Sequence, residues 1–152
     1  MYRISAQHRA CTWLLGLCVA ATLLTSPACQ TMSTDGVTPL PEGPVSFARD
    51  ILPIFADRCV SCHRPGGIAD LSGIDLDLRA DRAFSSLVNQ PSVQRPDLTL
   101  VVPDNADASL LYLKVASGNP PVGARMPLIA APLSAAQIEL IRKWINEGAG
   151  DN

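Results

Sequence analysis

The residues with the most distinctive chemistry are Cys59, Cys62 and His63, in the stretch Cys59-Val60-Ser61-Cys62-His63. Two closely spaced cysteines can ligate a zinc ion, cycle between a dithiol and a disulfide, or bond covalently to a cofactor. A structural zinc site needs a full tetrahedral set of Cys and His ligands, and a redox dithiol of the thioredoxin type is expected between a strand and a helix. The remaining cysteines and histidines and the neighbouring elements therefore decide between these uses.

The N-terminal segment, residues 1–28, is predicted to be a secretory signal peptide. Arg3 and Arg9 precede an apolar run at residues 11–24, and the small residues that follow fit a cleavage after Ala28. The apolar run is too short for a membrane-spanning helix, which needs roughly 20 apolar residues. We therefore expect the chain to be exported to the periplasm.

Cys29 would be the first residue after cleavage, and the stretch around it resembles a bacterial lipobox, in which that cysteine becomes lipid-modified. The match departs from the family pattern at Ser26, where leucine is usual. Acyl chains on Cys29 would anchor the protein to a membrane, whereas ordinary cleavage would release a soluble periplasmic protein. We expect the lipoprotein, with residues 29–44 as a flexible tether rich in Pro, Gly, Ser and Thr and one domain over residues 45–150.

Removal of residues 1–28 leaves no second cysteine pair to complete a zinc site, because Cys29 stands alone and His63 is then the only histidine. The residues before the motif show helical spacing, not a strand pattern: Phe47, Ile51, Ile54 and Phe55. We therefore expect one covalently attached haem (haem c), with zinc and disulfide chemistry as the alternatives. Cys59 and Cys62 would each form a thioether with a haem vinyl group, and His63 would be an axial ligand of the iron.

The opposite face of the iron is expected to be ligated by Met126, in the loop Arg125-Met126-Pro127. Met126 is the only methionine of the predicted domain, and no histidine remains for this place. Three alternatives stay open: Met126 as a flexible core filler, Lys114 as the ligand, or an iron with an open coordination position.

Three further residues are candidates for contacts with the haem propionates: Arg64, Arg125 and Trp144. Surface salt bridges are the alternative for the two arginines. A core position is the alternative for Trp144, whose indole N–H needs a partner when it is buried. Gly66 and Gly67 follow the motif and are expected in a turn beside the haem edge, where a side chain would crowd the ring.

The predicted domain has an all-α pattern with long loops. Pro53 marks the first turn, or a kink, of the helix before the motif. The remaining helices are predicted at residues 79–88, 107–117 and 134–147. The last has the clearest signals, because Ser134 and Gln137 can form a capping box and Gly148 follows its end.

The haem-attachment motif, the Arg125-Met126-Pro127 loop and a final helix containing Trp144 resemble those of a class I mono-haem cytochrome c, over about residues 47–149. The resemblance implies a small cytochrome c-like helical domain whose long loops wrap around the haem. It also implies that the first and last helices cross next to the haem, with Phe55 and Trp144 near the contact. Lys114 and Lys143 are the only lysines, so the lysine ring of mitochondrial-type cytochromes is missing.

The expected function is that of a single-electron carrier in a respiratory or other periplasmic redox chain, exchanging electrons with redox partner proteins. A peroxidase-like haem enzyme or a haem-based gas or redox sensor is the alternative, and either needs an open or displaceable axial position. The chain from Cys29 onward has ten basic and fourteen acidic residues, a net charge near −4. Such an acidic domain without a basic cluster argues against nucleic acid as a partner.

Overall fold

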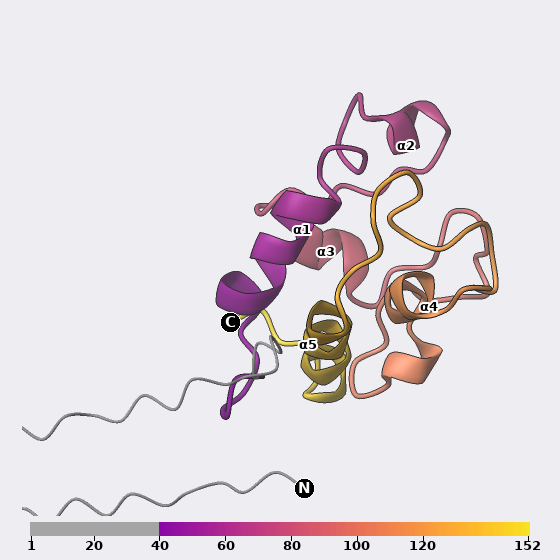
Figure 1. The fold of residues 1–152 in the computed structure, drawn as a ribbon. Coiled ribbons are helices and arrows are strands. Elements are labelled where there is room, and N and C mark those ends of the chain that lie inside the picture. The colour runs from indigo at the N-terminus through magenta and orange to yellow at the C-terminus, as the bar shows by residue number, and fades with distance from the viewer. Residues whose placement is uncertain (1–39) are drawn as a thin grey trace, which may run out of the picture. The chain divides into compact units, whose positions relative to one another are not determined.

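A computed structural model describes residues 40–152 of the chain (Figure 1). The regular elements in this range are helical: the π-helical turn η1 (Phe47–Ile51), α1 (Leu52–Arg58), α2 (Ile68–Leu71), α3 (Ala83–Leu87), the 3-10 turn η2 (Ala106–Ala108), α4 (Leu110–Ala116) and α5 (Ala135–Asn146). The β-type pairings of the described residues are isolated bridges, Val88 with Val101 and Pro91 with Thr99. The domain is thus mostly helical, as predicted.

The predicted signal peptide at residues 1–28, Cys29 and residues 30–39 of the tether lie outside the described residues. Across residues 40–152, none of the helices combines the length and the apolar character that crossing a membrane requires.

The helical segment before the motif consists of two elements. Ser46 caps η1 by accepting a hydrogen bond from the Arg49 N–H at 3.2 Å. Pro53 stands in the first turn of α1, where a missing N–H costs no intrahelical bond. The wider π-helical turn before it was not predicted, but the position of Pro53 in the first turn of the main helix is confirmed.

Helix α5 has the ends that its sequence predicts. The Ser134 hydroxyl accepts from the Gln137 N–H at 3.2 Å, and the Gln137 side chain accepts from the Ser134 N–H at 3.0 Å. The chain leaves the helix through Gly148, whose φ of +95° is a left-handed conformation that favours glycine. The apolar stripe buries Ile141, Trp144 and Ile145.

The two middle helices are shorter than predicted. The helix predicted at 79–88 is reduced to α3, because residues 79–82 form a turn in which the Arg79 guanidinium pairs with the Asp77 carboxylate at 2.6 Å. The helix predicted at 107–117 is divided at Ser109, which is fully buried and bonds to the Asn105 carbonyl at 2.7 Å. Helix α2 was not predicted.

The N-terminal turn and the last helix meet through aromatic side chains. Phe47 of η1 stacks on Trp144 of α5 with ring centroids 5.0 Å apart, and it makes an edge contact with Phe55 at 6.2 Å. All three rings are buried in one core cluster. The contact between the first and last helical segments is therefore present, with Phe47 at its centre.

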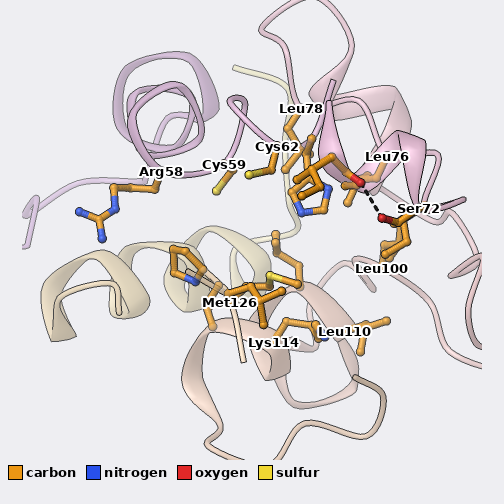
Figure 2. Close-up of a pocket in the computed structure, with 18 of the residues that line it drawn as sticks. Arg58, Cys59, Cys62, Ser72, Leu76, Leu78, Leu100, Leu110, Lys114 and Met126 are labelled. Atoms are coloured by element: carbon orange, nitrogen blue, oxygen red, sulfur yellow. Dashed lines mark hydrogen bonds between the residues drawn. The ribbon is translucent and has the colours of Figure 1, made fainter. Parts of the chain in front are cut away.

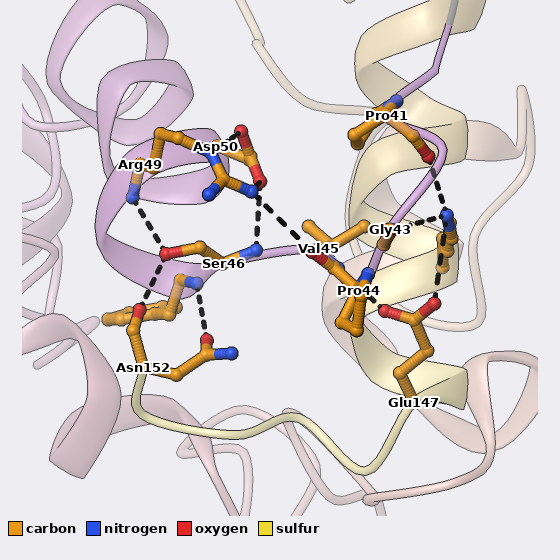
Figure 3. A network of polar contacts seen from close by, with 11 residues as sticks. Pro41, Gly43, Pro44, Val45, Ser46, Arg49, Asp50, Glu147 and Asn152 are labelled. Carbon is orange, nitrogen blue, oxygen red and sulfur yellow. Dashed lines mark hydrogen bonds and ion pairs between the residues drawn. The ribbon is translucent and has the colours of Figure 1, made fainter.

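Hydrogen bonds join the two ends of the described chain (Figure 3). The Lys143 ammonium donates to the carbonyls of Pro41 and Gly43, both at 2.9 Å, and the Val45 N–H donates to Glu147 at 2.8 Å. The Ser46 hydroxyl donates to the Asn152 carbonyl at 2.7 Å. Residues 41–44, predicted as the end of the flexible tether, therefore bind to α5, and the bonded domain extends past both predicted boundaries, 45 and 150.

Candidate functional site

A cavity of about 530 Å³ lies between the end of α1, helices α2 and α4, and the loop after Met126. This volume lies within the range of roughly 300–1,000 Å³ that is usual for ligand and cofactor pockets. Figure 2 shows Cys59 and Cys62 on one side of the cavity and Met126 with Lys114 on the opposite side. Its apolar lining is rich in leucine: Leu76, Leu78, Leu87, Leu100, Leu110 and Leu133.

The backbone after α1 brings the motif to the cavity. The Cys59 N–H donates to the Phe55 carbonyl at 2.9 Å and closes the helix, and the N–H groups of Cys62 and His63 donate back to the Cys59 carbonyl at 3.1 and 2.9 Å. These bonds form a tight turn, so both cysteines and the histidine line the cavity together. Both cysteines are free and half-buried.

The surroundings of Cys59 disfavour the thiolate, which is the reactive form of a cysteine. Burial raises the pKa of Cys59 to about 11. Cysteines that exchange disulfides have a lowered pKa, produced by positive charge or a helix N-terminus. Cys59 instead follows the C-terminal end of α1, whose dipole disfavours a thiolate. The surroundings of Cys59 therefore argue against a thioredoxin-like dithiol.

The side chain of His63 is half-buried, and its buried Nδ1 atom has no hydrogen-bond partner among the described residues. Burial, and to a lesser degree the positive charge of Lys114, lowers the pKa of His63 below its ordinary value. This shift favours the neutral imidazole, the form that can ligate a metal. An unpartnered buried ring nitrogen is costly, and an ordered water or a bound group in contact with Nδ1 would remove that cost.

Met126 is held against α4 on the facing wall. Its N–H donates to the Lys114 carbonyl at 2.7 Å, and its side chain is partly buried against the core cluster. The Lys114 ammonium also lines the cavity, but it donates to the Val122 carbonyl at 2.8 Å. Burial lowers the pKa of Lys114. The sequence alternatives for the second ligand, Met126 and Lys114, therefore both line the cavity, and the Lys114 ammonium already has a hydrogen-bond partner.

Gly67 is required by the backbone of the motif. A Cβ atom at this position would lie 2.2 Å from the Cys62 carbonyl oxygen, far inside van der Waals contact. Gly66 has a φ of +73° with open space around it. The predicted turn is confirmed, but the crowding that excludes a side chain at Gly67 comes from the Cys62 backbone.

We expect Gly67→Ala to disturb the motif itself. The Cys62 carbonyl cannot rotate away as a flexible side chain would, so the free energy of unfolding should fall by about 3 kcal/mol, the upper end of the usual overpacking cost. Denaturant unfolding of the purified protein measures this. Gly118→Ala is the matched control, because nothing lies within 4 Å of a Cβ at that glycine. Equal stability of the two variants would contradict the steric role of Gly67.

The three residues predicted to contact propionates do not line the cavity. Trp144 is buried in the core, and its indole N–H donates to the Gly150 carbonyl at 2.9 Å. The structure therefore does not support a propionate contact for Trp144, but it confirms the core position. Arg125 donates to the Val115 carbonyl at 3.0 Å, and Arg64 is exposed.

Among the described residues, the cations that line the cavity are Arg58 and Lys114. Sequence reasoning did not single out Arg58. Its place directly before Cys59, at the end of the motif's helix, was the signal that could have identified it.

The residues that line the cavity fit the cofactor that the sequence predicts. The lining combines two free thiols, a neutral imidazole with an unpartnered nitrogen and a facing thioether within an apolar wall. Within residues 40–152 no three His, Cys, Asp or Glu side chains converge as a metal site, and a haem held by one histidine and one methionine needs no such group.

Comparisons with protein-family models, with curated proteins and with solved structures found no match to this chain. The function of the cavity therefore has to be inferred from its own residues.

Proposed function

We propose that this domain binds one haem covalently through Cys59 and Cys62 and acts as a single-electron carrier. The observation that carries the proposal is the convergence of both thiols, His63 and Met126 on one apolar cavity of cofactor size. Cys59 and Cys62 would hold the haem as thioethers, and His63 and Met126 would ligate the iron from opposite sides. The haem supplies an iron that gains and loses one electron.

The residues around the cavity favour a carrier over an enzyme. If His63 and Met126 both held the iron, no position on it would be left for a substrate. The thioether of Met126 would be a soft, neutral ligand, and the lining of the cavity is mostly apolar. Both features would favour the reduced state of the iron and a high potential. The residues of this chain would position the two ligands and limit the access of water to the haem.

The proposed redox partner is not expected to be recognised through lysines. Lys143 donates to the carbonyls of Pro41 and Gly43, and Lys114 donates to the Val122 carbonyl. Around the cavity, exposed apolar side chains stand instead, among them Ile68, Val93 and Ile129. Electron exchange with a partner protein should therefore depend weakly on ionic strength.

The proposed periplasmic lipoprotein rests on the sequence around Cys29. If Cys29 is acylated, Cys29→Ser should shift the exported protein from the membrane fraction to the soluble fraction, because the protein would lose the chains that anchor it. Fractionation with immunodetection measures the shift, and Cys18→Ser, in the predicted signal peptide, is the control. A wild-type protein that is wholly soluble, with an unmodified Cys29 by mass spectrometry, would favour ordinary cleavage.

Spectroscopy of the haem-loaded protein tests the carrier proposal. We expect a low-spin iron in both oxidation states, a reversible one-electron titration and no binding of carbon monoxide to the resting reduced protein. A high-spin ferric spectrum with rapid binding of carbon monoxide after reduction would overturn the carrier in favour of a peroxidase-like enzyme or a sensor.

A further inference from the structure

The loop after Met126 has one hydrogen-bonded contact with the rest of the domain. Its ends are fixed, since the Met126 N–H donates to the Lys114 carbonyl and Leu133 is buried in the core. Between them, in the described part of the chain, the only hydrogen bond that reaches residues 127–133 comes from the Arg58 guanidinium, whose Nη2 donates to the Ala131 carbonyl.

The side chains of the loop do little to hold it in place. Leu128 is 65% exposed and Ile129 is 84% exposed. Loops with little apolar burial and few hydrogen bonds open at low free-energy cost. The contact from Arg58 is thus the main restraint between the two ends of residues 127–133.

Arg58 connects the two halves of the proposed haem site. It is the last residue of α1 and precedes Cys59, so its backbone is fixed to the attachment motif. Its side chain lines the cavity and is 25% exposed, and its nearest carboxylate, on Asp57, lies 3.9 Å away and is largely exposed. The guanidinium is therefore bound to the loop carbonyl and is not drawn away by a close ion pair.

We propose that Arg58 is a positioning residue that holds the Met126 loop closed over the cavity and so sets how readily the methionine leaves the iron. This inference rests on the proposed function. While Arg58 is hydrogen-bonded to the Ala131 carbonyl, the loop would keep Met126 at the iron, and loss of this hydrogen bond would let external ligands compete with Met126.

The test is the rate at which imidazole displaces Met126 in the haem-loaded ferric protein, followed by the loss of the sulfur-to-iron band. Arg58→Met keeps an apolar side chain without hydrogen-bond donors. Arg58→Gln has a side chain too short to reach the Ala131 carbonyl. We expect imidazole to displace Met126 about ten times faster in both variants. Loss of one hydrogen bond of about 1.4 kcal/mol corresponds to this factor. Arg58→Lys should restore part of the slow rate.

Arg82→Met is the matched control, because the Arg82 Nε lies 3.8 Å from the carboxylate of the neighbouring Asp81, much as Arg58 lies beside Asp57, while the Arg82 side chain is 63% exposed and does not line the cavity. Its rate should equal the wild-type rate. The Arg58 variants should lose no more unfolding free energy than the one hydrogen bond contributes, about 1.4 kcal/mol, whereas a merely structural role would lower stability without a matching rise in the displacement rate. One outcome would overturn only the role of Arg58: the wild-type protein shows the sulfur-to-iron band, but imidazole displaces Met126 no faster in Arg58→Met and Arg58→Gln than in the wild type. A wild-type protein without the band would overturn both this role and the proposed ligation.

Discussion

Replacement of both Cys59 and Cys62 by alanine is expected to abolish covalent haem. Each thioether bond needs one of these sulfurs, and in the described part of the chain no other cysteine lies at the cavity. After denaturation in acid acetone, the wild-type polypeptide should keep its haem, and the double variant should keep none. The single variants should keep haem through one bond at reduced yield.

Ser61→Ala is the matched control for this experiment, because Ser61 stands between the two cysteines and lines the same cavity. It should retain haem like the wild type. If the double variant kept haem through acid acetone, or if the control lost it, attachment at Cys59 and Cys62 would be wrong.

Met126→Ala is expected to convert a closed iron into an open one. The variant should lose the far-red sulfur-to-iron band, bind carbon monoxide when reduced and cyanide when oxidised, and have a lower potential because the soft thioether is gone. Partial burial of the side chain adds a loss of about 2 kcal/mol in the free energy of unfolding.

Met126→Leu separates ligation from packing in this prediction. Leucine has nearly the volume of methionine, so it should cost less than about 1.5 kcal/mol of stability while producing the same spectral changes. Met32→Ala, in the predicted tether, should change nothing. A sulfur-to-iron band that survives in Met126→Leu would show that another sulfur ligates the iron, whereas a low-spin wild-type protein without this band would point to Lys114 as the ligand.

The elements that could be predicted from the sequence are those fixed by local signals. The capping box of Ser134 and Gln137 and the glycine at position 148 define both ends of α5. Helix α2 was missed because four residues are too few to show a helical period. The predicted helix at 79–88 was too long, because a side-chain pair between Asp77 and Arg79 favours a turn over the helix that the propensities allow.

The candidate site also has residues that the sequence predicts and contacts that it does not predict. Cys59, Cys62 and His63 are close in sequence, so their spacing alone predicts their joint use. Met126 was predicted as the only methionine of the domain, with Lys114 and an open iron as the alternatives. The acceptors of Arg58 and Trp144 are the backbone carbonyls of Ala131 and Gly150. Every residue has a backbone carbonyl, so the sequence cannot indicate which carbonyl accepts a hydrogen bond. The hydrogen bonds of Arg58 and Trp144 could therefore be found only in the folded chain.

The most direct test of covalent haem binding is the mass of the wild-type protein, produced in a host that matures c-type cytochromes and measured after denaturation. We predict the mass of the polypeptide plus one haem, carried by a peptide that contains Cys59 and Cys62. A polypeptide of unmodified mass, with the haem released by denaturation or never bound, would contradict the proposal.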